Sequence, residues 1–315
     1  MRIGLDIMGG DYAPEQIVSG AILAYKELSS SCEIVLLGPK QIIASQILAH
    51  GGNPDWFSIV DSPETIEMGE DPIKAFKTKP KSSIVQGFHM LKKEQLDGFA
   101  SAGSTGAMMV GAMHVSEPIP GVLRPCIASM YPNLDKGYNL ILDVGINANS
   151  KPEYLYQFAI IGTLYAQLIN NVRNPKVGLL NIGSEPGKGS FLCQKSFELM
   201  QNSNDFNFIG NIEANDLFNN NKVDVIVTDG FTGNVIIKHA ESFYSIMKQR
   251  NISDTFFDRL NFENIGGTPI LGINHTVIVG HGISTKIAVK NMLLQTKLVI
   301  ESKISTNIKK MLNNE

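Results

Sequence analysis

A glycine-rich segment at residues 181–190, NIGSEPGKGS, contains one lysine, Lys188. It follows an apolar run and resembles a phosphate-binding Walker loop, but only three residues separate Gly183 from Gly187, and Gly189 replaces the Ser or Thr that would hold magnesium. An NTPase is therefore not expected. A flexible turn that presents one ammonium group suits a phosphate or a developing oxyanion. The alternative is an ordinary solvated surface lysine.

The segment SAGSTGA at residues 101–107 joins an expected strand to an expected helix. Free backbone amides at a helix start bind anions, so the residues Gly103, Ser104, Thr105 and Gly106 are candidates for a phosphate site. Small residues alone are a weak signal. A tight turn in which Ser104 or Thr105 caps the helix is equally compatible with the sequence.

Two further segments place polar side chains directly after apolar runs. DGFTGN at residues 229–234 contains Asp229, Thr232 and Asn234, and DVGINANSKP at residues 143–152 offers Asp143 and Asn147. Any of these side chains could orient a polar substrate. Helix capping is the alternative for Asp229 and Asn234, and in isolation it is the more common role.

Histidine, cysteine and metal chemistry are less well supported. His281 lies between two glycines and could donate to a phosphate or move a proton near neutral pH, but a lone histidine is more often structural. The three cysteines are far apart and have neither CxxC nor Cys/His spacing. We therefore expect no disulfide framework and no metal site, and we expect the protein to reside in a reducing cytosol. Cys126 has no evident His partner and is interpreted as a small buried hydrophobic residue.

The elements that must position these side chains alternate between strand and helix. This pattern is typical of the α/β class, with a mainly parallel sheet covered on both faces. Ligands of such sheets collect at the carboxyl ends of the strands, where the segments above are found. The expected strands are 2–7, 33–38, 57–60, 97–101, 140–144, 176–182, 224–229 and 276–280, and the expected helices include 14–28, 82–93, 152–169 and 290–311.

The organisation of the 315 residues shows no linker, repeat or low-complexity segment. We expect one continuous α/β domain over 1–315, with two intertwined subdomains as the alternative, and a helical excursion at 240–262. The net charge of −3 argues against a nucleic-acid partner. The longest apolar run, 155–169, is too short for a membrane span.

The order of these motifs resembles the PlsX family of phosphate acyltransferases over nearly the whole chain. The resemblance implies transfer of a fatty acyl group from acyl carrier protein to inorganic phosphate, with no cofactor, and an acyl phosphate product that a downstream glycerol-3-phosphate acyltransferase uses in phospholipid synthesis. It also implies a homodimer, cytoplasmic but able to contact the membrane, with a three-layer α/β/α fold like isocitrate and isopropylmalate dehydrogenases. The resemblance is carried by DIMGGDYAP, SAGSTGA, LDVGINANSKPEYLYQFAIIGTLYA, NPKVGLLNIGSEPGKGS, VDVIVTDGFTGNVIIK and GTPILGINHTVIVGHGIS.

Three departures from the family pattern weigh against essential roles for Ser104, Asn149 and Thr285. The family usually has Asn where this chain has Ser104 and Asp where it has Asn149, and Thr285 replaces an acidic or amide residue. The 240–262 excursion is also shorter than the usual helical projection of the family.

The resemblance and the loops together suggest a set of roles. Lys188 would hold phosphate or the oxyanion, the amides of residues 103–106 would complete an anion nest, and Asn147 and Asn234 would orient substrate. Asp229 would organise Lys188 or accept a phosphate proton. These roles can be exchanged among the same residues without contradicting the sequence.

Carrier protein and membrane contacts require other surfaces. Acyl carrier proteins are acidic, so Lys77, Lys79 and Lys81 are candidate docking residues, with a solvated charge run as the alternative. Phe256 and Phe257 could form an amphipathic membrane tip, although packing within a dimer explains them equally well.

Two other functions fit parts of the sequence. A phosphotransacetylase-like enzyme would use coenzyme A thioesters, and a non-catalytic adaptor at the membrane would need none of the loop residues. A nicotinamide-dependent dehydrogenase is not supported, because no GxGxxG follows a strand with an acidic partner about 20 residues on.

Overall fold

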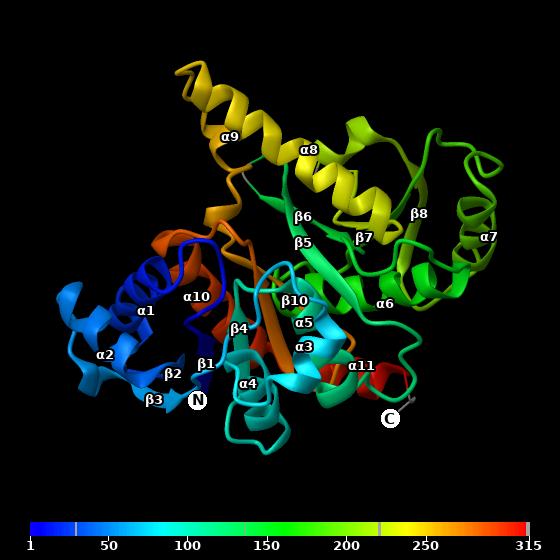
Figure 1. Cartoon of the computed structure of the whole chain (residues 1–315). Helices are drawn as coiled ribbons and strands as arrows, with labels where there is room; N and C mark the ends of the chain where they lie inside the picture. Colours follow the sequence, from blue (N-terminus) through cyan, green and yellow to red (C-terminus); the bar gives the residue numbers. More distant parts are fainter. Residues whose placement is uncertain (29, 136, 220–221, 313–315) are drawn as a thin grey trace. The chain divides into compact units, whose positions relative to one another are not determined.

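The computed structural model describes residues 1–28, 30–135, 137–219 and 222–312 (Figure 1). The chain divides into two compact units, each made of two separate segments. Unit 1 contains Met1–Pro118 and Phe262–Lys303, and unit 2 contains Ile119–Asn261 and Ile304–Glu315. The chain therefore passes from one unit to the other three times.

The sheet of unit 1 is parallel apart from one strand. Its order is β3-β2-β1-β4-β11-β10, and β10 pairs antiparallel to β11. The strand cores are apolar and almost fully buried, as expected for a sheet that is covered on both faces. The strands are β1 (Arg2–Asp6), β2 (Glu33–Gly38), β3 (Ser58–Asp61), β4 (Gly98–Ser101), β10 (Gly267–Leu271) and β11 (Thr276–Gly280).

Small residues let the helices of unit 1 approach the sheet closely. A Cβ atom on Gly98 would meet Thr296 of α10, and one on Gly87 of α4 would meet the ring of Phe99. Because Gly98 and Phe99 are successive strand residues, α10 and α4 cover opposite faces. The helices are α1 (Glu15–Leu28), α2 (Lys40–Ala49), η1 (Pro54–Trp56), α3 (Pro72–Thr78), α4 (Ser83–Lys92), α5 (Thr105–Gly111), the π-helix η2 (Ala112–Ser116), η4 (Phe262–Asn264) and α10 (Lys286–Ser302).

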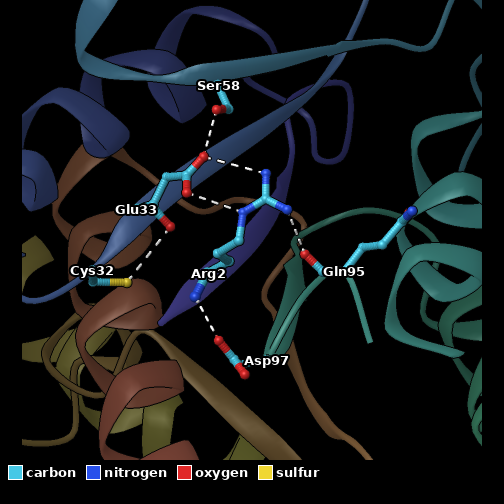
Figure 2. Close-up of polar contacts among 6 residues, drawn as sticks. All are labelled: Arg2, Cys32, Glu33, Ser58, Gln95 and Asp97. Carbon is cyan, nitrogen blue, oxygen red and sulfur yellow. Dashed lines mark hydrogen bonds and ion pairs between the residues drawn. The ribbon is translucent and has the colours of Figure 1, made fainter. Parts of the chain in front are cut away.

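A charged network joins the amino ends of the strands in unit 1, at the edge opposite to the loops of interest. Figure 2 shows the Glu33 carboxylate between the Arg2 guanidinium and the Ser58 hydroxyl. The Arg2 Nη1 atom also donates to the Gln95 carbonyl at 2.9 Å, and the Arg2 amide donates to Asp97 at 2.6 Å. Hydrogen bonds from Ser58 and Arg2 lower the pKa of Glu33. This network links β1, β2, β3 and the start of β4.

The sheet of unit 2 has the order β5-β6-β9-β7-β8. β5 and β6 are antiparallel, and the remaining pairs are parallel. Its strands are β5 (Cys126–Pro132), β6 (Tyr138–Leu142), β7 (Lys176–Leu180), β8 (Asn207–Ile212) and β9 (Val225–Val227). The mainly parallel α/β class predicted from the sequence is confirmed.

The central helix of unit 2 is α6 (Pro152–Leu168), which begins with proline at its first position, where the missing N–H costs nothing. A Cβ atom on Gly162 would lie 2.5 Å from Val225, so the helix lies close against β9. α6 and α8 lie on opposite sides of this sheet (Figure 1). The other helices are α7 (Phe191–Met200), η3 (Ala214–Phe218), α8 (Gly230–Gln249), α9 (Thr255–Asp258) and α11 (Ile304–Leu312).

The predicted bounds of one helix were wrong. The helix predicted at 290–311 begins at Lys286 and is broken at Lys303, whose φ of 52° is left-handed, into α10 and α11. The excursion predicted at 240–262 is the second half of α8, the short α9 and the start of η4. The strands β5, β8 and β10 were not predicted. Within the described ranges, no helix has the length and apolar character needed to cross a bilayer.

Candidate functional site

Unit 1 contains a buried carboxylate at the carboxyl end of its central strand. Asp6 is the last residue of β1, and its side chain is almost fully buried. The Ser101 hydroxyl donates to Oδ2 at 2.7 Å, and the Met8 amide donates to Oδ1 at 3.0 Å. Burial raises the pKa of Asp6, and these bonds together with one to Ser83 oppose the rise. Asp6 thus ties the end of β1 to the end of β4 and, through Ser83, to the start of α4.

Three glycine-rich loops of unit 1 meet around this carboxylate. A Cβ atom on Gly9 would lie 2.4 Å from the Asp6 carboxylate and 2.6 Å from the Gly103 amide, so only glycine fits. The Asp11 amide donates to the Gly282 carbonyl at 2.7 Å, which joins the loop after β1 to the loop after β11. The segments containing residues 103–106 and His281, separate in sequence, therefore end at one edge of the sheet.

The predicted phosphate residues of unit 1 have different local roles. Ser104 is buried and caps α5, accepting a hydrogen bond from the Ala107 amide at 3.3 Å. The Gly103 amide donates to Ser101 at 2.9 Å, and a Cβ atom on Gly106 would touch Pro72. Thr105 is exposed. Thr105 and Gly106 occupy the first turn of α5, where intrahelical bonding does not use the amides.

His281 is half-buried, and its ring lies against Phe262 with the centroids 4.7 Å apart. Its backbone carbonyl accepts hydrogen bonds from both the amide and the hydroxyl of Ser284. His281 is therefore built into the turn after β11 at both its ring and its backbone.

Unit 2 contains a second buried carboxylate, directly after β6. Asp143 is fully buried and accepts hydrogen bonds from the Ile127 amide at 2.8 Å, the Asn147 amide at 2.6 Å and the Asn147 Nδ2 atom at 2.9 Å. Burial raises the pKa of Asp143, and these amides oppose the rise. The Asn147 Nδ2 atom also donates to the Pro125 carbonyl. Asn147 is thus buried and bonded within its own loop.

The start of α8 packs directly onto this loop. The Gly230 amide donates to the Asn147 carbonyl at 2.9 Å, and a Cβ atom on Gly233 would lie 2.1 Å from the Asp143 carbonyl oxygen. Asp229 caps the helix, with one carboxylate oxygen accepting from the Thr232 amide and the other from its hydroxyl. Capping, the alternative reading of Asp229, is what the geometry shows.

Asn234 is half-buried on the first turns of α8. A Cβ atom on Gly145, which has a φ of 121°, would lie 3.2 Å from its Nδ2 atom. The loop that contains Asn147 and the start of α8, which contains Asp229, Thr232 and Asn234, therefore pack against each other at the carboxyl edge of the unit 2 sheet.

Lys188 lies in the loop between β7 and α7, and its side chain is 51% exposed. Its ammonium nitrogen is 3.9 Å from the Glu185 carboxylate, a long ion pair between exposed groups. Gly189 has a φ of 84°, and a Cβ atom there would lie 2.1 Å from Asn181. The departure from the Walker pattern at this position therefore has a steric cause. The sequence predicted that Asp229 could organise Lys188. In the structure, both carboxylate oxygens of Asp229 accept hydrogen bonds from Thr232, and the ion pair of Lys188 is with Glu185.

The three predicted docking lysines differ in availability. Lys77 and Lys81 are exposed on and after α3, whereas the Lys79 ammonium bonds the Glu70 carboxylate and the Thr65 carbonyl. Hydrogen bonding to Lys79 lowers the pKa of Glu70. Lys79 therefore has a structural role in unit 1.

Sequence reasoning missed Asp6 and Ser101 as the centre of the unit 1 loops. The signal available was an aspartate at the end of an apolar strand, with two glycines shortly after it.

Cys126 is fully buried. Burial is the larger cause that raises the pKa of its thiol, and the negative charge of the nearby Asp143 carboxylate raises it further. The expected role of Cys126 as a buried hydrophobic residue fits this position. No group of three or more potential metal ligands occurs among the described residues.

Glycine-rich loops at the carboxyl ends of mainly parallel strands lie where α/β proteins bind their ligands. The fold is similar to that of a phosphotransacetylase from Streptococcus pyogenes, with a TM-score of 0.64 and 16% identity, covering 96% of this chain and 94% of that one. At this identity the likeness shows the fold alone.

Sequence comparison defines the family. A family model described as Fatty acid synthesis protein matches residues 1–307. A phosphate acyltransferase from Dictyoglomus turgidum is 41% identical over 99% of this chain and 98% of its own length, and one from Salinibacter ruber is 38% identical over 96% and 95%. The chain belongs to this family of acyltransferases, as the motifs predicted.

Proposed function

We propose that the protein transfers a fatty acyl group from acyl carrier protein to inorganic phosphate and so forms an acyl phosphate for phospholipid synthesis. The observation that carries this function is the match to a phosphate acyltransferase at 41% identity over 99% of this chain and 98% of that relative. The ordered loops at the strand ends support it, because such a reaction requires that an anion be bound and oriented.

The reaction needs few specialised groups. A phosphate oxygen attacks the thioester carbon, and the tetrahedral intermediate then expels the carrier thiolate. The leaving thiol has an intrinsic pKa of about 8.5, so it departs without strong acid assistance. The protein must hold phosphate, orient it and stabilise the oxyanion.

Lys188 is the residue of unit 2 that we propose to bind the anion. Its side chain is half exposed, and its carboxylate partner is at the outer limit of an ion pair. An incoming phosphate can therefore replace this partner at low cost. In unit 1, we propose the first-turn amides of Thr105 and Gly106 as a further anion-binding element.

The amide side chains divide into two roles. Asn234 is half-buried and its Nδ2 atom faces Gly145, so it remains a candidate to orient substrate. Asn147 already donates to Asp143 and Pro125, which favours a role in holding the loop. Asp229 retains the proposed role of accepting a phosphate proton.

Phosphorus NMR tests the reaction directly. Purified protein is incubated with phosphate and palmitoyl-acyl carrier protein, beside palmitoyl-coenzyme A. We expect an acyl-phosphate signal from the carrier-protein substrate, and a loss of about 10²–10³ in rate for Lys188→Ala. Lys195→Ala is the matched control, because Lys195 is a surface lysine that pairs with Glu198 on α7. Normal rates in Lys188→Ala would remove Lys188 from the mechanism, and a preference for coenzyme A would favour the phosphotransacetylase-like alternative.

Carrier protein docking is proposed for the exposed lysines of unit 1. Neutralising Lys77 and Lys81 is expected to raise the KM for acyl carrier protein and to weaken its salt dependence, since rim charges act mainly on association. Lys79→Ala would instead affect stability through Glu70. Unchanged salt dependence in the double variant would exclude this surface.

The remaining proposals concern cell biology and assembly. They are a cytoplasmic homodimer with peripheral membrane contact, supply of acyl phosphate to a glycerol-3-phosphate acyltransferase, and a three-layer α/β/α fold like isocitrate and isopropylmalate dehydrogenases. The helices on both faces of each sheet support the layered fold. Against the membrane contact, Phe256 and Phe257 pack with each other, with ring centroids 5.4 Å apart, and Phe256 also contacts Phe218.

A further inference from the structure

The loop that contains Lys188 is held by side-chain amides from three different elements. Asn181, directly after β7, donates through Nδ2 to the Lys188 carbonyl at 3.1 Å. Gln194 of α7 donates to the carbonyls of Gly187 and Gly189, at 2.9 and 3.2 Å. Asn211 of β8 donates to the Glu185 carbonyl at 2.8 Å. We refer to Asn181, Gln194 and Asn211 as the amide clamp.

The clamp acts on the backbone on both sides of Lys188. It bonds the carbonyl of Lys188 and those of the preceding and following residues, both of which are glycines. Glycine gives a loop large conformational freedom, and residues 184–188 are exposed, so this segment would otherwise be mobile. Within the described part of the chain, the ion pair of the Lys188 ammonium is the 3.9 Å contact with the Glu185 carboxylate, which restrains the side chain less than the amide clamp restrains the backbone.

One member of the clamp is maintained at an energetic cost. Asn211 is 5% exposed, and its Oδ1 atom has no hydrogen-bond partner among the described residues. A buried unpaired acceptor is unfavourable, and an apolar side chain would avoid it. The Nδ2 bond to Glu185 is the interaction that an apolar residue would lose.

We propose that Asn181, Gln194 and Asn211 are positioning residues for Lys188, which fix its backbone so that a freely rotating ammonium is presented to the phosphate group. This inference rests on the proposed function. Three amides are suited to the task, because each donates to a carbonyl without adding a charge that would compete with the anion.

Steady-state kinetics of Gln194→Glu test the proposal. Glutamate has the shape of glutamine but cannot donate to the carbonyls of Gly187 and Gly189, and Gln194→Met, which removes the same two donors without adding a charge, must show the same losses if positioning and not charge repulsion is the cause. We expect kcat to fall about 10-fold to 100-fold and the KM for phosphate to rise, since a small misplacement of a binding group has effects of this size. The KM for acyl carrier protein and the thermal midpoint should stay unchanged. Gln201→Ala, an exposed glutamine at the end of α7, is the matched control.

Limited trypsin digestion supplies a readout that does not depend on acyl transfer. Trypsin cuts after Lys188, whose carbonyl accepts a hydrogen bond from Asn181 of the clamp. We expect faster cleavage at this bond in Gln194→Glu and in Asn181→Ala than in wild type or Gln201→Ala, and slower cleavage of wild type when inorganic phosphate is added.

The outcomes separate the two proposals. If wild type forms no acyl phosphate, the proposed function fails, and phosphate protection of Lys188 that is lost in Gln194→Glu still supports the clamp. Unchanged cleavage and kinetics in Gln194→Glu would overturn the positioning role. A lowered thermal midpoint with equal losses for both substrates would also overturn it, because the amides would then be purely structural.

Discussion

Asp6 in unit 1 and Asp143 in unit 2 occupy matching places and differ in their partners. Each is buried at the carboxyl end of a strand, and burial raises the pKa of each. The side-chain partners of Asp6 are the hydroxyls of Ser83 and Ser101, which can donate or accept. The partners of Asp143 are N–H groups, which only donate.

The difference predicts that the two carboxyl groups respond unequally to protonation and to replacement by an amide. Around Asp6, a hydroxyl can reverse its hydrogen bond when the carboxyl gains a proton or becomes an amide. Around Asp143, both oxygens must accept, because Ile127 donates to Oδ1 and Asn147 donates twice to Oδ2. We therefore expect the loop of unit 2 to tolerate less change than the loops of unit 1.

The largest effect is expected from the glycine that packs on Asp143. Gly233→Ala would place a methyl group 2.1 Å from the Asp143 carbonyl oxygen, whereas the Cβ atom of Gly103→Ala would lie 3.0 Å from its nearest neighbour, Gly9. Overpacking against backbone supports a loss of about 3 kcal/mol in the free energy of unfolding for Gly233→Ala, and about 1 kcal/mol for Gly103→Ala. Urea denaturation measures both. Equal losses would contradict the comparison.

Replacing each carboxylate by an amide should have a smaller, unequal effect. In Asp143→Asn, either orientation of the amide places an NH2 group against an N–H donor, so a buried donor is left unpaired at a cost of about 2 kcal/mol. In Asp6→Asn, the hydroxyls can adapt, and we expect a loss below about 1 kcal/mol. Urea midpoints of the two variants beside wild type provide the measurement. A larger loss for Asp6→Asn would show that the hydroxyls do not reverse.

The smallest expected effect is in the pH dependence of stability. Because the pKa of Asp6 is raised above its ordinary value of 3.8, the folded state binds this proton more tightly than the unfolded state. The contribution of Asp6 is thus fully present below 3.8 and is lost as the pH rises through the raised pKa. The stability difference between wild type and Asp6→Asn should therefore shrink as the pH increases across this window. Urea unfolding at a series of pH values tests the slope, and a difference that grows with pH would reverse the sign.

The sequence was sufficient for the parts of the fold that simple hydrophobic runs define. The strands predicted at 33–38 and 276–280 coincide with β2 and β11. The strands that were missed contain breakers or polar residues: Pro132 ends β5, Gly210 interrupts β8 and Pro269 lies within β10. Tertiary pairing overrides the weak local preference in these strands.

The sequence predicted which loops make up the candidate site. It did not predict the structural role of each residue within these loops. A polar residue after a strand shows where a site lies, because the carboxyl ends of parallel strands share an edge. Whether the side chain faces substrate or its own backbone depends on contacts with distant residues. Asn147 bonds Pro125 and Lys79 pairs with Glu70, and no local pattern reveals these partners.

The segmented construction of the two units has a consequence for biosynthesis. β11 lies beside β4, and α10 packs against α1, so unit 1 lacks an interior strand and a covering helix until Phe262–Lys303 leaves the ribosome. At ribosomal speed, the first 118 residues wait roughly 10–30 seconds for the second segment of unit 1. During that interval the nascent chain exposes the apolar face of α1 and an open edge of β4. The protein is therefore expected to depend on holding chaperones during synthesis.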